Sequence, residues 1–286
     1  MRRVGSAANE HYRSLLRLFA SARERRRSGR ILLDGLHLVE SYVQSRGPPE
    51  EVVVSESGSH SAEIASWIAT WGRRTTLTVV PDALLAKLTS VEAPSGIVAV
   101  VVQPVARRAA DPESDAVLLD GLQDPGNVGS ILRSAAAAGF AQVLLSADCA
   151  QAWSPKTLRA AMGAHFRLAI HEACDLAAFL GGYRGRALVT APDALTSVFD
   201  AQIDGPLAWV FGHEGQGVRA ALLDATPARV RIPMPGGSES LNVAAAAAIC
   251  LFETVRRRLA DPSRVAPDGL GGPQRRRRAV TWTGGG

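Results

Sequence analysis

The sequence predicts an α/β protein with two domains, and three features of the chain support this prediction. Its 286 residues are enough for two modest domains that each have a core. Short apolar runs alternate with stretches in which apolar residues recur at helical spacing, the pattern of sheets covered by helices. Residues 104–115 lose this periodicity and are rich in proline, alanine and charge, which is typical of a linker.

The first domain is expected over residues 30–103, after a basic extension at residues 1–29. In the extension, residues 8–29 favour a helix that runs into the segment RERRRSGR. The domain itself alternates strands and helices, and Pro81 suits the first turn of its last helix. The expected strands are residues 31–33, 52–55, 77–80 and 97–102, and the expected helices are residues 36–45, 62–71 and 81–88.

The second domain is expected over residues 116–260. Its strands alternate with helices, which favours a parallel, doubly wound sheet. The expected strands are residues 117–119, 143–145, 168–170, 187–190, 207–211 and 230–232. Residues 261–286 contain proline, glycine and a run of four arginines in place of an apolar pattern, so we expect a disordered basic tail.

The composition is that of a soluble globular protein, with 47% hydrophobic and 21% charged residues. The longest apolar run, Val243–Phe252, is half the length that spans a bilayer, and the arginine-rich start lacks the apolar core of a signal peptide. We therefore expect a cytoplasmic protein without a membrane segment. Cys149, Cys174 and Cys250 are far apart and have no histidine at ligand spacing, so we expect three buried thiols and neither a disulfide nor a metal site.

The positive charge is concentrated towards the two ends of the chain. Nine arginines fall in Arg2–Arg30 and eight in Arg256–Arg278, of 32 basic residues in all. Arginine grips phosphate through a planar fork and stacks on bases, so basic flanks on a chain of pI about 9.6 indicate a nucleic-acid partner. A GC-rich genome explains the preference for arginine over lysine but not the clustering. Arg25 and Arg26 are candidate RNA contacts in the first flank.

The stretch Val117–Phe140 predicts a buried strand, a turn and an amphipathic helix that carries one arginine. Arg133 lies four residues from both Gly129 and Ala137, so small side chains leave room around its guanidinium for a ligand. The alternative is an ordinary solvated arginine on a helix that Asn127 caps.

Two later stretches place glycines or polar side chains directly after a strand. WVFGHEGQGV, residues 209–218, ends in a loop with three glycines around Glu214, which exposes backbone amides. VRIPMPGGSESLNVAAAAAICLFE, residues 230–253, places Ser238, Ser240 and Asn242 before a helix, either as caps or as groups that hold a polar ligand. The fingerprints GxGxxG, GxxxxGK[ST] and HExxH are absent, which argues against a Rossmann dehydrogenase or a P-loop NTPase.

Taken in order, DPGNVGSILRSA, FGHEGQG and IPMPGGSESLNVAAA resemble the three motifs of the SpoU/TrmH family of RNA ribose 2'-O-methyltransferases. The first domain is similar to the family's small substrate-binding domain. The similarity rests on ILLDGLHLVES near its start and KLTSVEAPSGIVAVV near its end. The resemblance covers nearly all of residues 28–259. It implies a SPOUT catalytic domain with a deep C-terminal trefoil knot, which general topological rules discourage.

The resemblance also implies site residues and partners. The polar motif positions, implied to be catalytic, are Asn127, Arg133, Glu214, Ser240 and Asn242. The cofactor, S-adenosylmethionine, is implied to contact Phe211, Gly212, Glu214, Gly215, Gly217, Ile232, Met234, Ser240 and Leu241. RNA contacts are expected from Arg133 and from Lys156 and Arg159, whose segment WSPKTLRAAMGAHFRL also resembles a family segment, unless these two are simply solvated. With the alanine-rich helix 243–255, the resemblance implies a homodimer.

The implied function is methylation of a ribose 2'-hydroxyl in RNA, with ribosomal RNA of the 23S type preferred over tRNA because a separate substrate domain is present. Two other hypotheses remain open, namely a non-catalytic RNA-binding ribosome-assembly factor and a base methyltransferase. The assembly factor predicts damaged motifs, yet all five polar positions are present. Arg133 acts either as the base or, since a guanidinium is hard to deprotonate, as a group that holds RNA phosphate and stabilises the developing alkoxide.

Overall fold

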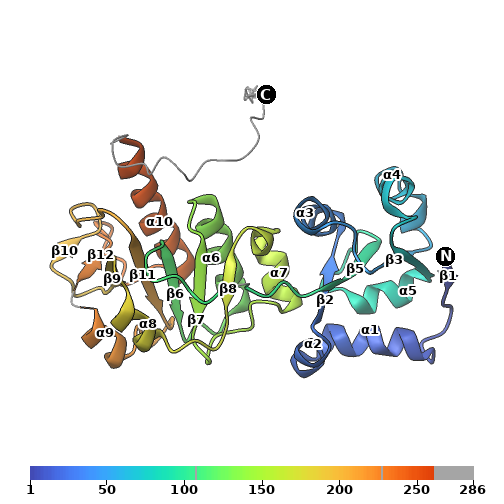
Figure 1. Cartoon of the computed structure of the whole chain (residues 1–286), viewed down its shortest axis with the longest axis horizontal. Helices are drawn as coiled ribbons and strands as arrows, with labels where there is room; N and C mark the ends of the chain where they lie inside the picture. The colour runs from blue at the N-terminus through green and yellow to red at the C-terminus, as the bar shows by residue number, and fades with distance from the viewer. Residues whose placement is uncertain (107, 227, 261–286) are drawn as a thin grey trace.

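The computed structural model has two lobes side by side, each built on one β-sheet (Figure 1). It describes residues 1–106, 108–226 and 228–260, and the expected basic tail at residues 261–286 lies outside the described residues. Within the described ranges, no helix is long and apolar enough to cross a membrane.

The first lobe contains a mixed sheet of five strands. Its elements are β1 (Arg2–Arg3), α1 (Glu10–Ala20), α2 (Ala22–Ser28), β2 (Arg30–Asp34), α3 (Leu36–Arg46), β3 (Glu51–Ser55), η1 (Gly58–His60), α4 (Ala62–Trp71), β4 (Thr76–Val80), α5 (Asp82–Leu85), η2 (Ala86–Leu88) and β5 (Ile97–Val102). The strand order is β1-β4-β3-β5-β2, and β5 is antiparallel to both of its neighbours. Successive residues of a strand point to opposite faces, so Leu32 and Val53 pack under α1 and α5, whereas Ile31 and Val52 pack under α3 and α4.

Residues 1–29 belong to the first lobe and do not form a separate extension, which corrects the sequence prediction. β1 pairs with β4, and Tyr12 and Leu15 on α1 are buried against the sheet. The Tyr12 hydroxyl donates to the Leu84 carbonyl at 2.8 Å. The expected single helix is broken at Ser21, which ends α1 and caps α2. Arginines on the outer side of α1 and α2 hid this buried apolar stripe in the sequence.

The second lobe contains a sheet of seven parallel strands in the order β10-β12-β9-β11-β6-β7-β8. Its elements are β6 (Ala116–Asp120), α6 (Pro125–Ala137), β7 (Gln142–Leu145), α7 (Pro155–Ala161), η3 (Ala164–Phe166), β8 (Ala169–His171), α8 (Leu176–Gly182), β9 (Arg186–Thr190), β10 (Thr196–Ser197), β11 (Leu207–Gly212), α9 (Ala220–Ala225), β12 (Arg229–Arg231) and α10 (Val243–Ala260). Residues of α6, α7 and α10 pack on one face and residues of α8 and α9 on the other. The predicted parallel α/β architecture is confirmed, and only the short β10 was missed.

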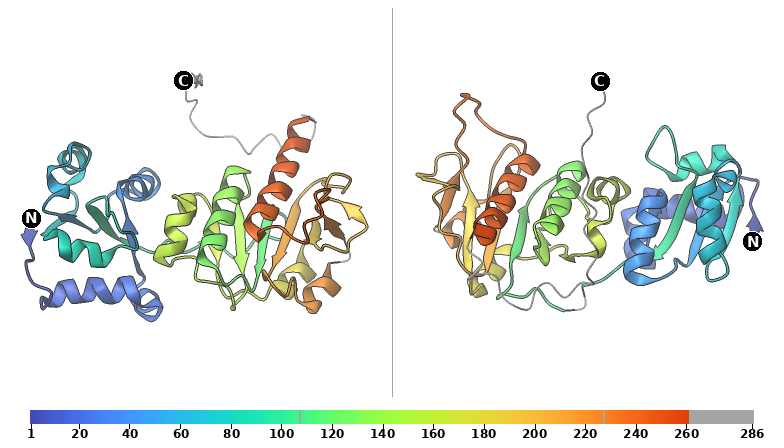
Figure 2. Two further views of the ribbon diagram at one scale, coloured as in Figure 1. Left: turned by 180° about the vertical axis from the view of Figure 1, so that it is seen from behind. Right: turned by 90° about the horizontal axis from the view of Figure 1, so that it is seen from above.

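The segment from β12 to α10 returns across this sheet. β12 lies beyond β9, two places from β11, yet α10 packs against α6 and β11. The views agree that α10 and α6 lie side by side (Figure 2). Trp209 of β11 donates from Nε1 to Thr254 Oγ1 of α10 at 3.0 Å, and Arg258 pairs with Asp115 at the end of the expected linker. These contacts, together with the buried Ala247, Cys250 and Leu251, fix α10 against the sheet.

The three cysteines only partly follow the prediction. All three are free, but Cys250 alone is buried, whereas Cys149 and Cys174 are half-buried near the ends of β7 and β8. Among the residues that the structure describes, no group of histidine, cysteine, aspartate and glutamate side chains is placed to hold a metal ion.

The two lobes meet at a packed interface. The rings of Tyr42 on α3 and Phe166 in η3 touch edge to face, with centroids 5.4 Å apart. Next to them, Gly163 has a φ of +85° and faces Ser41 so closely that a Cβ there would lie 2.7 Å from the Ser41 hydroxyl oxygen. Only glycine fits this position without displacing α3. The lobes are thus held in one relative arrangement by close contact.

Candidate functional site

The first motif begins where β6 ends. The chain turns through Gly121, and α6 starts with Asp124 as its N-cap, whose carboxylate accepts from the Gly126 amide at 2.9 Å. Asn127 is therefore not the helix cap, contrary to one interpretation of the sequence. It lies half-buried in the first turn of α6, with a side chain that is available for other contacts.

Asn127 joins the three motifs through hydrogen bonds. Its Nδ2 donates to Glu214 Oε1 at 2.9 Å, and its Oδ1 accepts from Asn242 Nδ2 at 2.9 Å. Asn242 in turn accepts the Ala244 and Ala245 amides with its own Oδ1, so it caps α10. Because the cap requires the oxygen of Asn242 to face the helix, its NH₂ group must face Asn127. The direction of the whole chain of bonds, up to the Glu214 carboxylate, is fixed by the start of α10.

The loop that carries Glu214 is closed on itself. Backbone bonds of 3.0 and 2.9 Å join His213 and Gly217 in both directions. His213 Nδ1 also accepts the amides of Gly215 and Gln216, at 2.9 and 3.2 Å. Gly217 has a φ of +70°, and a Cβ on Gly212 would overlap the Gly217 backbone, so both positions require glycine.

Asp120 and Arg219 anchor this loop, and the sequence analysis overlooked them. Asp120 is 1% exposed and accepts from the Arg219 amide at 2.9 Å and from its Nε at 2.7 Å. These bonds raise the pKa of the Arg219 guanidinium. A charged residue that ends a fully buried strand was the available signal, because a buried carboxylate needs a partner.

The loop between β12 and α10 supplies the rest of the expected cofactor contacts. Ile232 and Met234 are half-buried and Leu241, next to Asn242 in the chain, is 42% exposed, so this loop presents accessible apolar surface. Ser240 accepts from the Ser238 hydroxyl through its carbonyl, at 3.0 Å. Phe211 is fully buried against Trp209, so any contact it makes with a cofactor is through its backbone.

Arg133 does not join the trio. It lies six residues after Asn127, about 9 Å further along α6, and its exposed side chain lines the cleft that faces the first lobe. The sequence argument for space around it also needs correction. Gly129 is buried, and a Cβ there would lie 2.5 Å from Ala160 Cβ and 2.6 Å from the Thr157 carbonyl oxygen. That glycine lets α7 approach α6 and leaves no room for a ligand.

Close packing of α6 on α7 brings the predicted basic side chains together. Arg133, Lys156 and Arg159 line one hollow beside Met162. Arg159 Nη1 lies 3.9 Å from Asp34 Oδ2 of the first lobe, and burial raises the pKa of that carboxyl.

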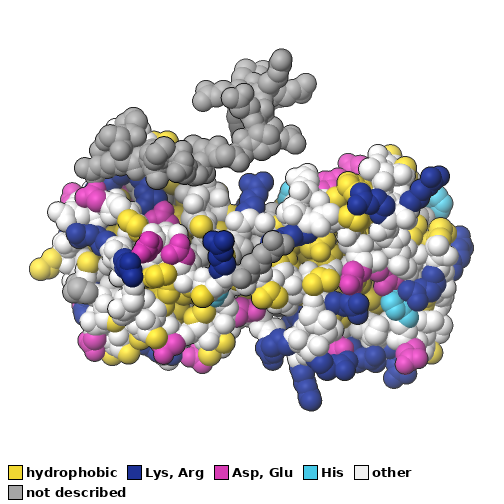
Figure 3. All heavy atoms as spheres, in the orientation of Figure 1, with side chains coloured by type: hydrophobic (Ala, Val, Ile, Leu, Met, Phe, Trp, Pro, Cys, Tyr) yellow, Lys and Arg dark blue, Asp and Glu magenta, His cyan; other side chains and the backbone are white. Residues whose placement is uncertain are grey.

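The two arginines predicted in the first flank have different surroundings. Arg25 is 6% exposed and donates to the carbonyls of Leu18 and Phe19 and to Gln151 Oε1 of the second lobe. It therefore joins the lobes and is not placed to contact RNA, which corrects the prediction. Arg26 is exposed, and Figure 3 shows basic side chains gathered over α1 and α2.

Two families match the two lobes. Residues 115–252 match the SpoU rRNA Methylase family, and residues 9–99 match the MRM3-like substrate binding domain. A 23S rRNA (guanosine(2553)-2'-O)-methyltransferase of Bacillus subtilis, RlmP, is 31% identical over 88% of the chain and 98% of its own length. The chain belongs to the SpoU rRNA methylase family.

Other relatives of this SpoU family protein also align over most of its described length. An uncharacterised tRNA/rRNA methyltransferase of Synechocystis is 32% identical over 86% of the chain and 90% of its own length. A solved RNA 2'-O ribose methyltransferase is 32% identical with a TM-score of 0.78, over 90% of the chain and 99% of that structure. The SpoU methyltransferase AviRb of Streptomyces viridochromogenes, solved with AdoMet, is 27% identical with a TM-score of 0.80, over 88% and 99% of the two chains. The resemblance seen in the three motifs is thereby confirmed.

Proposed function

We propose that this protein transfers a methyl group from S-adenosylmethionine to a ribose 2'-hydroxyl of ribosomal RNA, of the 23S type in preference to tRNA. The observation that carries the proposal is the meeting of Asn127, Glu214 and Asn242, which come from three separate motifs. The names of the relatives and of the matching family support ribosomal RNA as the substrate class. We assign the reaction to the cytoplasm from the sequence pattern alone.

The loops around the trio fit the cofactor chemically. In the loop after β11, the Glu214 amide and the carbonyls of residues 214–216 take no part in the bonds that close the loop, and Met234 and Leu241 offer apolar surface for an adenine ring. When bound, S-adenosylmethionine supplies an electrophilic methyl group on a sulfonium. We also propose that the return of the chain from β12 to α10 is the crossing that forms the trefoil knot of the family.

In the proposed mechanism the protein aligns the ribose with the methyl donor and stabilises charge on oxygen. Alignment of the two reactants lowers the activation barrier of such a reaction by about 7–11 kcal/mol. A bound S-adenosylmethionine would supply its methyl group to the ribose 2'-oxygen, with the thioether as the leaving group, and the hydroxyl proton would pass to water at the open cleft. Arg133, charged and exposed at the cleft, is suited to hold an RNA phosphate and to stabilise the oxygen as that proton departs.

Replacement of Arg133 tests this role. Arg133→Ala is expected to leave S-adenosylmethionine binding unchanged, because the side chain lies away from the trio, and to lower single-turnover methylation about 100-fold or more. Arg133→Lys keeps the charge but loses the fork, and we expect nearly the same loss. Normal methylation by Arg133→Ala would refute the assignment.

Two measurements separate the proposal from its alternatives. Titration calorimetry with S-adenosylmethionine distinguishes an enzyme from an assembly factor, which has no need of the cofactor. Mapping of the modified nucleotide by resistance to alkaline cleavage then distinguishes ribose from base methylation, since only a 2'-O-methyl group blocks cleavage at that position.

We further propose a homodimer that forms through α10. Ala245, Phe252 and Leu259 follow at seven-residue spacing on the side opposite the core-facing Ala247, and Phe252 and Leu259 are 47% and 73% exposed. This apolar stripe suits a second helix. Phe252→Asp should therefore shift the sedimentation coefficient to that of a monomer, whereas Leu195→Asp, at a site 96% exposed on another surface loop, should not. A fully active wild-type monomer would contradict the proposal.

A further inference from the structure

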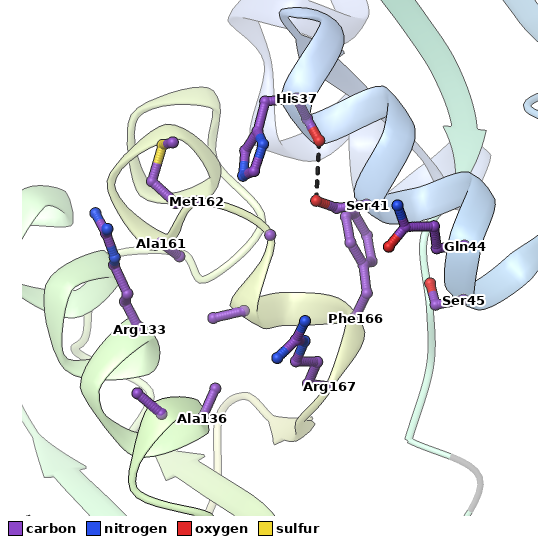
Figure 4. Close-up of a pocket in the computed structure, with 13 residues that line it drawn as sticks. His37, Ser41, Gln44, Ser45, Arg133, Ala136, Ala161, Met162, Phe166 and Arg167 are labelled. Atoms are coloured by element: carbon purple, nitrogen blue, oxygen red, sulfur yellow. Dashed lines mark hydrogen bonds between the residues drawn. The ribbon is translucent and has the colours of Figure 1, made fainter. Parts of the chain in front are cut away.

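The cleft between the lobes has two chemically different walls (Figure 4). From the first lobe, α3 contributes His37, Ser41 and Gln44, which are polar and capable of hydrogen bonding. From the second lobe, the wall contains the cations Arg133 and Arg167, together with apolar side chains. No carboxylate among the described residues lines the cleft, and its volume of about 450 Å³ is that of a small-ligand site. A ligand that fits these walls is anionic on one side and rich in polar edge groups on the other.

The α3 wall has unused hydrogen-bonding capacity. His37, Ser41 and Gln44 stand four and three residues apart and so share one face of the helix. The Ser41 hydroxyl donates to the His37 carbonyl at 2.9 Å. In contrast, the exposed imidazole of His37 and the amide of Gln44 have no hydrogen-bond partner among the described residues. An imidazole and a primary amide each offer donors and acceptors, which is what the edge of an unpaired base requires.

The two walls are held in place before any ligand arrives. Ser41 packs against Gly163, and Tyr42 packs against Phe166, directly beside the cleft. The spacing of the walls is therefore set by the lobe interface. A preformed site loses less free energy in ordering when it binds.

Arg133 lies where this cleft adjoins the hollow that contains Lys156 and Arg159. Arg133 and Met162 line both spaces. In the structure as described, neither Arg133 nor Lys156 forms an ion pair, whereas Arg159 faces Asp34. The cleft and the hollow together make a track with positive charge on one side and the hydrogen-bonding side chains of α3 on the other.

On the basis of the proposed function, we propose that the cleft holds an unpaired nucleotide adjacent to the methylated ribose. His37 and Gln44 contact the edge of its base, Arg167 contacts its phosphate, and the next phosphate of the strand lies in the hollow by Lys156. The first lobe thereby selects the sequence that is methylated, and it does so through α3. Sequence-specific RNA recognition generally reads unpaired bases in this manner.

The test begins with protein-free ribosomal RNA and labelled S-adenosylmethionine, from which the methylated nucleotide is mapped. Short RNAs around that position are then made with each of the four bases at the two neighbouring nucleotides. We expect the wild-type protein to prefer one base. His37→Ala and Gln44→Ala should each lower kcat/KM for the preferred RNA about 2- to 10-fold, as for a lost hydrogen bond, and the double variant should lose most of the preference. The KM for S-adenosylmethionine should stay unchanged.

His60→Ala is the matched control, because His60 is an exposed histidine of the same lobe that does not line the cleft. Gln44→Glu adds a second test, since a carboxylate in the cleft should weaken RNA binding and leave the melting temperature unchanged. If the double variant keeps both the wild-type kcat/KM and the wild-type base preference, the inference is overturned while the proposed function stands. If the wild-type protein methylates no ribose, the proposed function fails and the inference fails with it.

Discussion

Replacement of Asn127 by aspartate tests the chain of bonds that joins the three motifs. The two side chains have the same shape, so the aspartate in Asn127→Asp would still accept from Asn242. Towards Glu214, however, a donor becomes a carboxylate oxygen at a distance of 2.9 Å. Loss of a hydrogen bond to a charged group costs about 1.5–3 kcal/mol, and repulsion between carboxylates about 4 Å apart adds about 1 kcal/mol where water screens it. Because Glu214 is exposed and Asn127 is half-buried, solvent screening reduces both contributions, and we take about 2–3 kcal/mol for their sum.

That free energy corresponds to a loss of about 30- to 150-fold in kcat/KM for methyl transfer. Glu214→Gln alone keeps the bond, because the glutamine oxygen accepts from Asn127. In the Asn127→Asp background, Glu214→Gln restores a hydrogen bond, because the glutamine amide donates to the new aspartate. The assay is a double-mutant cycle on kcat/KM and on calorimetric affinity for S-adenosylmethionine. We expect a coupling of at least about 1 kcal/mol in cofactor affinity, with unchanged global stability. Additive effects of the two changes would refute the bond as the link between motifs.

Three further predictions concern the loop, the helix packing and the C-terminal helix. His213→Ala should weaken S-adenosylmethionine binding in calorimetry, whereas His213→Asn should not, because the asparagine oxygen can accept the same two amides. Gly129→Ala should lower the free energy of unfolding in urea by about 1–3 kcal/mol through overlap with α7, whereas Gly181→Ala, with open space around it, should not. Glu253 is held by Arg256 and Arg257, which lower its pKa from 4.5 to about 2, so it stabilises the fold above pH 4.5 and this contribution disappears as the pH falls towards 2. Glu253→Gln should therefore flatten the decline of the urea midpoint over that range.

The sequence predicted nearly every strand of the fold, because apolar runs between turn formers are read locally. It failed where position in space decides the role of a residue. Arg25 and Arg26 are neighbours in one basic run, yet only the folded chain shows that Arg25 is buried between the lobes and Arg26 is not. Tyr12 sits among charged residues in an expected extension, but its ring is fully buried in the first lobe.

The sequence predicted which residues form the candidate site but not how they are arranged. Motif resemblance placed Asn127, Glu214 and Asn242 together, and the structure supplies the bonds between them. The motif pattern does not show that Arg133 lies apart from that group. Its place on α6, six residues after Asn127, puts its side chain at the cleft. Asp120 was overlooked because its partner Arg219 is 99 residues away, and only its place at the end of a buried strand signals that it needs a partner.

The dependence of the site on the start of α10 has a consequence for biosynthesis. Asn127 is bonded to residues 87 and 115 positions later, and the second of these takes its orientation from α10, the last helix described. Contacts of such long separation form late in folding, after the loops between them have closed. While the chain emerges from the ribosome, the first lobe and most of the second sheet can be complete when the site is not. A nascent or truncated chain that ends before residue 242 contains Asn127 and Glu214 but lacks Asn242, which sets the direction of the bond between them, so the complete set of bonds at the site forms only after α10 has been made.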